Sequence, residues 1–175
     1  PVADAGGPFT GDEGSPITMD GSNSTDVDDA IVTWAWDCDN NGVFETIATG
    51  ATTGSCTFDN EGTYTVGLQV VDAAGANSTN TSTATVTVSN VAPSVTATGP
   101  GTGDEGATLS YSATATDPSA SDSATLTIAW TAVELPSTTV GTGSGASFSF
   151  VPDDDGVFLI TATVTDSAGA SSSSA

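Results

Sequence analysis

Short runs in which apolar and polar residues alternate recur along the chain and predict β-strands. In residues 62–72, GTYTVGLQVVD, every second position from Tyr64 to Val70 is apolar, and residues 156–166, GVFLITATVTD, repeat the pattern. A period of two places one face of a strand against a core and the other in solvent. Runs rich in Thr and Val at 82–90, 107–117 and 124–133 are similar, and no useful helical stripe occurs. The pattern predicts an all-β protein.

The chain contains two copies of one unit. Residues 1–17 align without a gap to residues 93–109 and share Gly-Asp-Glu-Gly at 11–14 and 103–106. The strand at 62–72 aligns in the same way to 156–166, so the period is 92 to 94 residues. An immunoglobulin-like β-sandwich has about 100 residues. We therefore expect two tandem immunoglobulin-like β-sandwich domains, at residues 1–91 and 92–175.

Two stretches of the first copy resemble a known family. Residues 20–39, DGSNSTDVDDAIVTWAWDCD, followed by residues 62–75, GTYTVGLQVVDAAG, resemble the polycystic kidney disease (PKD) domain. The second copy keeps TATDPS at 114–119 but has Thr131 after Trp130, so it resembles PKD and cadherin-like repeats more distantly. The resemblance implies tandem modules of secreted or cell-surface proteins, which act as spacers or contact polysaccharide and protein surfaces. It implies no reaction.

The charge balance narrows the function classes. The chain has 22 acidic residues and no Lys, Arg or His, a formal charge of −22. Binding to nucleic acid or to an anionic membrane is excluded, because both depend on Lys and Arg. No internal salt bridge is expected, so each carboxylate must be solvated, hydrogen-bonded to backbone amides or bound to a cation. This composition favours a saline or calcium-rich exterior, hence a secreted or cell-surface protein.

Catalysis is not expected of this composition. Without His or Lys, acid–base chemistry would fall to Asp, Glu or the two Tyr residues, and Ser or Cys nucleophiles would lack their usual base. A carboxylate pair of the glycosidase type remains the one enzymatic alternative. Because the sequence opens on Pro1, we also expect a processed or excised segment of a longer protein.

The loop after the Trp-rich strand is a candidate calcium site. Asp37, Asp39 and Asn41 stand at alternate positions and are followed by Gly42 and Glu45. In calcium loops such oxygens converge on one hard cation while a glycine takes the sharp bend. The same segment is also a favourable hairpin turn without any metal. Both interpretations remain open at the level of sequence.

A second acidic cluster lies just before the same strand. Asp26, Asp28 and Asp29 fall within four residues, and no basic side chain can pair them. Such carboxylates repel one another unless a cation intervenes, although a solvated acidic turn is the usual fate of a charge run. The PKD resemblance also implies calcium here. We expect Ca²⁺ to stabilise the protein, chiefly through the first domain.

Cysteines and sequons indicate extracellular chemistry. Cys38 and Cys56 are the only cysteines, both lie in the first domain, and two nearby cysteines in an extracellular chain predict a disulfide. Asn23, Asn77 and Asn80 begin Asn-x-Ser/Thr sequons and are candidate glycan acceptors.

The aromatic residues divide between structural and binding interpretations. Trp36 and Trp130 are equivalent across the repeat and predict core tryptophans of a central strand. Trp34 either joins that core or lies partly exposed, where it could stack on sugar rings. Tyr64 stands where a tyrosine corner would form, and Phe158 replaces it in the second copy. The second domain should therefore be the less stable one.

The end of the second copy predicts an incomplete sandwich. Residues 82–90 of the first copy form a strand whose counterpart is missing after residues 167–175, SAGASSSSA. A sandwich without its last strand exposes backbone groups and an apolar groove. Either the polypeptide continues into the groove, or a neighbouring copy adds a strand, with the N-terminal residues 1–9 as the expected donor. The second alternative is head-to-tail and propagates into a fibre.

These observations favour a non-catalytic structural module: a surface stalk, an adhesin repeat or a fibre subunit stabilised by calcium. Its partners would be neighbouring copies or repeats of itself. The alternative is a polysaccharide- or protein-binding accessory module of a secreted enzyme or adhesin, which would use exposed aromatic residues such as Trp34 or Phe9.

Overall fold

The computed structural model describes all residues from Pro1 to Ala175 and divides into two compact units, Pro1–Asn90 and Val91–Ala175. Almost all regular structure is strand, so the all-β expectation is confirmed; the single helix, α1, is one turn long (Ala120–Ser123). That helix is far too short to cross a membrane. Each unit is described below by itself.

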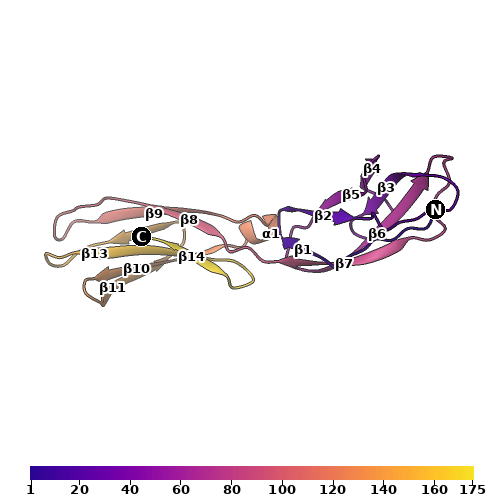
Figure 1. The fold of residues 1–175 in the computed structure, drawn as a ribbon. Coiled ribbons are helices and arrows are strands. Elements are labelled where there is room, and N and C mark those ends of the chain that lie inside the picture. Colours follow the sequence, from indigo (N-terminus) through magenta and orange to yellow (C-terminus); the bar gives the residue numbers. More distant parts are fainter. The chain divides into compact units, whose positions relative to one another are not determined.

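Unit 1 is a sandwich of a five-stranded and a two-stranded sheet (Figure 1). The larger sheet has the order β1-β7-β6-β3-β4, in which β1 runs parallel to β7 and the other pairs are antiparallel. The smaller sheet pairs β2 with β5. The strands are β1 (Phe9–Asp12), β2 (Pro16–Asp20), β3 (Ile31–Asp37), β4 (Thr46–Thr49), β5 (Thr53–Thr57), β6 (Gly62–Asp72) and β7 (Ser82–Ser89).

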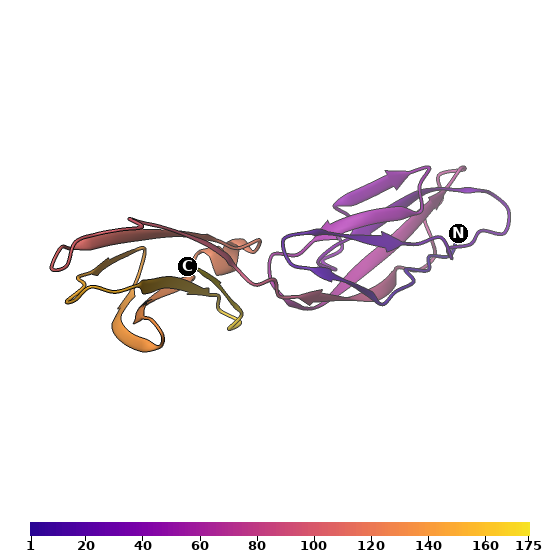
Figure 2. The same ribbon diagram turned by 60° about the vertical axis from the view of Figure 1, so that its left-hand side comes forward.

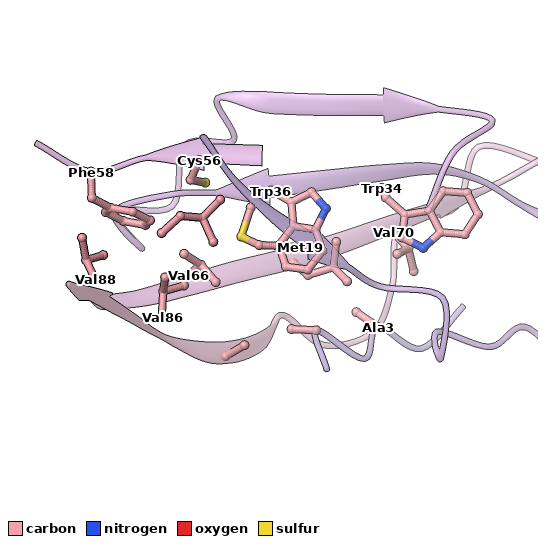
Figure 3. Close-up of a cluster of buried hydrophobic side chains, with 14 residues drawn as sticks. Ala3, Met19, Trp34, Trp36, Cys56, Phe58, Val66, Val70, Val86 and Val88 are labelled. Atoms are coloured by element: carbon pink, nitrogen blue, oxygen red, sulfur yellow. The ribbon is translucent and has the colours of Figure 1, made fainter. Parts of the chain in front are cut away.

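The core of unit 1 gathers the apolar faces that alternation predicted. Along β6, Val66, Leu68 and Val70 are fully buried. The antiparallel register places Trp36 opposite Leu68 and Trp34 opposite Val70. Figure 3 shows both indole rings within the cluster of buried side chains that fills the space between the sheets. Alternation along β3 and β6 thus sets which side chains build this core.

Unit 2 is a sandwich of a four-stranded and a three-stranded sheet, which Figure 2 shows as two separate layers. The sheets have the orders β11-β10-β13-β14 and β12-β9-β8. The strands are β8 (Ser94–Thr98), β9 (Leu109–Thr116), β10 (Thr127–Glu134), β11 (Thr138–Ser144), β12 (Ser147–Phe150), β13 (Phe158–Thr165) and β14 (Ser171–Ser174).

The register confirms the equivalence of the two core tryptophans. Trp130 lies opposite Ala162 in β13, the position that Leu68 has in β6 opposite Trp36. The core of unit 2 is smaller, with six buried hydrophobic residues against fourteen in unit 1. Since apolar burial is the main stabilising term in folding, unit 2 should unfold more easily.

The last strand differs most between the units. In unit 1, β7 pairs with β6 from Leu68 all the way to Gly62. In unit 2, β14 pairs only with Ala162–Thr165, which leaves the first half of β13 without a partner on that side. Ser174 occupies the position opposite Ala162 that Ser82 has opposite Leu68. The final strand of unit 2 is therefore present as β14, which corrects the expectation that it is wholly missing.

Candidate metal centres and an open strand position

The loop after β3 is built around the buried carboxylate of Asp37, which is only 2% exposed. One of its oxygens accepts the N–H of Asn41 at 3.1 Å and the other that of Gly42 at 2.7 Å. Gly42 has φ of +91°, a left-handed conformation that glycine adopts without strain. This is the sharp bend expected at that glycine.

Two more carboxylates of this loop approach Asp37. Asp39 accepts the backbone N–H of Asn41 at 3.2 Å and its side-chain amide at 2.8 Å. Glu45 reaches back to accept the N–H of Cys38 at 2.8 Å. Oxygens of Asp37, Asp39 and Glu45 all lie within 4.8 Å of one another. The loop thus brings its three predicted carboxylate ligands together, while its hydrogen bonds also form a turn without a metal.

The acidic turn at residues 26–29 is organised differently. One oxygen of Asp26 accepts the N–H groups of Asp28 at 3.0 Å and Asp29 at 3.3 Å. The other lies 2.8 Å from the α-ammonium group of Pro1. The expectation of no internal salt bridge was therefore wrong, because it considered side chains only. No group of three carboxylates within 4.8 Å includes Asp28 or Asp29.

These contacts shift the pKa of the groups involved. The hydrogen bond to the Pro1 ammonium, helped by the N–H of Asp28, lowers the pKa of Asp26 well below its usual range. The same hydrogen bond raises the pKa of the Pro1 amine. The pKa of Asp28 is raised, first by its hydrogen bond with Asp26 and then by the charge of that carboxylate. Backbone N–H groups of Asp28 and Asp29 also hold the Asp26 carboxylate in this turn.

The predicted disulfide between Cys38 and Cys56 is confirmed, with Cα atoms 5.7 Å apart. Cys38 directly follows β3 of the larger sheet and Cys56 lies in β5 of the smaller one, so the bond ties the two sheets together. The tyrosine corner is also present, since the hydroxyl of Tyr64 donates to the carbonyl of Asn60 at 2.9 Å. The disulfide joins the two sheets of unit 1, and the tyrosine corner fixes the start of β6 to the turn before it.

Trp34 is a core residue. It is 8% exposed, and its indole N–H donates to the carbonyl of Gly21 at 3.0 Å. The alternative in which Trp34 stacks on a sugar ring was therefore wrong. Phe9, the other aromatic considered for binding, packs edge-on against Trp36 with ring centroids 6.2 Å apart.

The three sequon asparagines are exposed but not equivalent. The side-chain amide of Asn80 donates to the carbonyl of Ala3 and accepts the N–H of the same residue, both at 3.0 Å. A glycan on this nitrogen would break the pair. Asn23 and Asn77 lie in a loop and at an isolated bridge, respectively, and remain the more accessible candidates.

A groove of about 600 Å³ lies in unit 2. Ala175 lines it together with residues 156–160, which include the start of β13, where β14 provides no partner. Residues 99–103 also line the groove. In the repeat they align with residues 7–11 of unit 1, which include the start of β1, and β1 pairs with β7. The lining of the groove includes the apolar side chains of Leu109, Tyr111, Trp130, Phe150, Phe158 and Ile160, and also the acidic residues Glu105, Asp154 and Asp155. The groove is therefore only partly apolar.

The expected strand donor is not free. Val2 bridges to Thr25, the side chains of Ala3 and Ala5 are buried, and the strand β1 begins at Phe9. The N-terminal segment is thus built into its own unit. The expectation that residues 1–9 serve as a free donor was wrong, because their small apolar side chains fill the core of unit 1.

Within unit 2 the structure brings together a set of carboxylates that the sequence pattern does not single out. Asp117 follows β9, Asp122 lies in α1 and Asp166 follows β13, and their oxygens lie within 4.8 Å of one another. Only the repeat alignment hinted at them, since Asp166 matches Asp72.

Comparison with solved structures returns proteins of low similarity. Fibronectin(III)-like modules of Clostridium thermocellum CbhA match with 17% identity over 98% of this chain and 86% of theirs, with a TM-score of 0.38. Carbohydrate-binding modules of the β-sandwich superfamily match with 17% identity over 91% of this chain and 82% of theirs, with a TM-score of 0.39. Three N-terminal domains of the bacteriophage RB49 outer capsid protein Hoc match with 15% identity over 99% of this chain and 57% of theirs, with a TM-score of 0.36. No curated protein matches the sequence.

The family is shown by the sequence itself. The profile of the PKD domain matches residues 1–88, which is half of the chain and nearly all of unit 1. The match covers the core strands β3 and β6, the disulfide and the tyrosine corner. PKD domains are typically extracellular, non-catalytic modules. The chain belongs to the PKD domain family.

Proposed function

We propose that this chain is a non-catalytic structural module of a secreted or cell-surface protein, such as a stalk, an adhesin repeat or a fibre subunit. The observation that carries the proposal is the closed PKD sandwich of unit 1. Its two sheets are joined by the Cys38–Cys56 disulfide, and the carboxylates of its acidic loop accept hydrogen bonds from the chain's own amides. Such a unit keeps its shape without performing chemistry.

A glycan-binding test separates this role from that of an accessory binding module. Trp34 and Phe9 pack into the core instead of presenting flat faces to solvent, so the full chain should bind no polysaccharide. Retention on any polysaccharide matrix that survives moderate salt would contradict a purely structural role. A disulfide-intact preparation with normal near-ultraviolet circular dichroism is the required control for folding.

Calcium at the loop after β3 is the second part of the proposal. Asp37, Asp39 and Glu45 would hold the ion, because carboxylate oxygens are the ligands that Ca²⁺ prefers and each carboxylate keeps lone pairs beyond those that accept N–H groups. The bound ion would neutralise three converging charges in a chain without cationic side chains. It would fasten the loop to the end of β3.

Thermal unfolding tests this calcium site. If Ca²⁺ binds only the folded loop, the melting temperature of unit 1 should rise with free Ca²⁺ over a chelator control at matched ionic strength. Asp39→Asn should remove the rise, whereas Asp12→Asn, at an exposed position of β1, should keep it. Equal melting of the unsubstituted protein in chelator and in millimolar calcium would show that this loop is a metal-free turn.

Strand addition between neighbouring copies or repeats is the third part. In unit 1, β7 presents Ala84, Val86 and Val88 to the core at alternate positions. The groove of unit 2 lies beside the part of β13 that β14 does not cover, and its lining includes apolar side chains, so a strand with one apolar face would fit it. Because β7 itself is paired with β6 and β1, the donor would be an unpaired segment of a neighbouring copy or repeat. Donor and acceptor surfaces then differ, so repeated addition extends head to tail.

A synthetic peptide with the sequence of residues 82–90, STATVTVSN, mimics such a donor. Binding to the full chain should slow hydrogen exchange in residues 158–161, which pair with β10 but have no partner strand on their other side. A peptide carrying Asp at the positions of Val86 and Val88 should not bind, because it would bury two charges. A protein that stays monomeric at every concentration and ignores the peptide would refute strand addition while leaving the module's structural role intact.

A further inference from the structure

The larger sheet of unit 1 ends on β4, which pairs with β3 and has no partner strand on its other side. Gly50 donates its N–H to the carbonyl of Val32 at 2.9 Å and so continues the register of this pair. Bonded and non-bonded pairs alternate along an antiparallel ladder, so every second residue of β4 bonds to β3 as Gly50 does. The N–H and C=O groups of Ile47 and Thr49, which lie between those residues, therefore point toward the open edge.

This edge lacks the features that usually prevent pairing with another strand, which are charged residues, prolines and bulges. Residues 46–58, TIATGATTGSCTF, contain no charged residue and no proline, in a chain with 22 carboxylates. The register of β4 with β3 has no shift. By contrast, β1 at the other edge of the sheet carries Asp12, and β11 of unit 2 pairs across a register shift between Ala132 and Val133. The edge at β4 is therefore open to another strand.

The side chain of Ile47 adds an apolar contact at this edge. It is 65% exposed and lies opposite Ala35 of β3. Because side chains alternate along a strand, both lie on the face of the sheet turned away from Trp34 and Trp36 in the core, and Thr49 shares that face. A strand laid against β4 would cover Ile47 without removing any charge from water.

We propose that β4 pairs with β4 of a second copy of this chain, antiparallel and about a two-fold axis at Ala48. In this register Ile47 of each copy lies opposite Thr49 of the other, and these are the residues whose backbone groups face the open edge. The two residue pairs form four backbone hydrogen bonds and join two five-stranded sheets into one continuous sheet. The same surface is used on both copies, so the assembly closes at the dimer.

Charge and register favour a second copy as the partner. Each copy has a formal charge of −22, so contact through acidic surfaces is repelled, whereas β4 contributes no charge. The axis at Ala48 places Glu45 of one copy opposite Ala51 of the other, not opposite a second Glu45. Asp20, which hydrogen-bonds to Thr52, is the other carboxylate near the end of the paired segment. Repulsion among these carboxylates weakens the dimer at low salt, and screening by salt relieves it.

This lateral pairing does not rest on the proposed strand addition at the groove of unit 2, which extends head to tail. Sedimentation equilibrium of the full chain in chelator tests it. The mass should rise with protein concentration toward twice the chain mass of 17.0 kDa and stop there. The dissociation constant should fall about tenfold between about 0.1 M and about 1 M salt, because the Debye length shortens from about 10 Å to about 3 Å.

Residue-resolved hydrogen exchange identifies the strand that pairs. In the dimer the amides of Ile47 and Thr49 should exchange more slowly, because they gain partners. The amides of Thr46 and Ala48 should change less, because they already bond to β3.

Substitutions at Ile47 isolate the edge from the rest of the fold. Ile47→Pro removes an N–H that faces away from β3, and Ile47→Asp places a charge in the paired segment. Each should weaken dimerisation about tenfold or more, whereas Ile47→Val should keep it. Thr10→Asp adds the same charge at an exposed position of β1, on the opposite edge of the sheet, and should dimerise like the unsubstituted protein. Near-ultraviolet circular dichroism and an intact disulfide verify that each variant is folded.

Four results would overturn the proposal. The first is a protein that stays monomeric at about 1 mM in high salt, since even a weak pairing should be populated there. The second is a dimer of unchanged strength in both Ile47→Asp and Ile47→Pro. The third is equal weakening by Thr10→Asp, which would indicate a general effect of charge. The fourth is assembly beyond the dimer that ignores Ile47 substitutions, which would assign association to the groove of unit 2.

Discussion

Reduction of the Cys38–Cys56 disulfide should destabilise unit 1 by a calculable amount. The bond joins residues that are 18 positions apart and lie at the end of β3 and in β5. In the chain-entropy account, a cross-link of this span removes about 3 kcal/mol of conformational freedom from the unfolded chain. For a unit of this size each kcal/mol corresponds to about 4–8 °C, so the melting temperature of unit 1 should fall by roughly 12–24 °C.

Differential scanning calorimetry of the full chain, with and without reductant, measures this shift. Unit 2 contains no cysteine, so its transition serves as an internal control and should not move. Thiol counting must show complete reduction before the scans are compared. Cys38→Ala with Cys56→Ala should reproduce the effect without reductant, with a further loss because Cys56 is only 2% exposed.

The reasoning fails if unit 1 melts at the same temperature after complete reduction. That result would mean that the loop between the two cysteines is already restricted in the unfolded chain, so that the bond adds no constraint. A shift of both transitions together would instead indicate a general effect of the reductant on the protein.

Three further predictions follow from contacts in unit 1. Gly54→Ala should destabilise unit 1 by about 1–3 kcal/mol in urea unfolding, because the new methyl group would lie 2.8 Å from Nε1 of the buried Trp36. Gly101→Ala is the control and should be neutral, because its methyl group would meet nothing within 4 Å. Tyr64→Phe should cost about 0.5–1.5 kcal/mol by the same assay through the lost hydroxyl bond, and an unchanged midpoint would show that the tyrosine corner contributes nothing. Because the pKa of Asp26 is lowered on folding, its contact stabilises the protein above pH 3.8, the ordinary pKa of Asp, and this stability is lost on acidification. Because the pKa of the N-terminal amine is raised on folding, its contribution to stability is lost as the pH rises beyond 8.0. Asp26→Asn should flatten both limbs of the unfolding midpoint plotted against pH, and two unchanged limbs would show that other groups titrate there.

Local patterns in the sequence were sufficient to predict the strands, the repeat and the conformation of single turns. The alternation of residues 62–72 predicts β6 because side chains on a strand point to opposite faces, and the same rule places Trp36 and Trp130 in the two cores. The bend at Gly42 could likewise be predicted, since the residues that form it are neighbours in the chain. The two cysteines could be paired because no other partner exists for either.

Only the tertiary structure decided which distant groups meet. Alternation alone could not bury Trp34, whose burial depends on the carbonyl of Gly21 and on packing between the sheets. Asp117, Asp122 and Asp166 form a set only because β9, β13 and the helix α1 end at one place in unit 2. Such contacts follow from the packing of whole elements, which depends on the total shape of the core and not on the order of residues within any one segment.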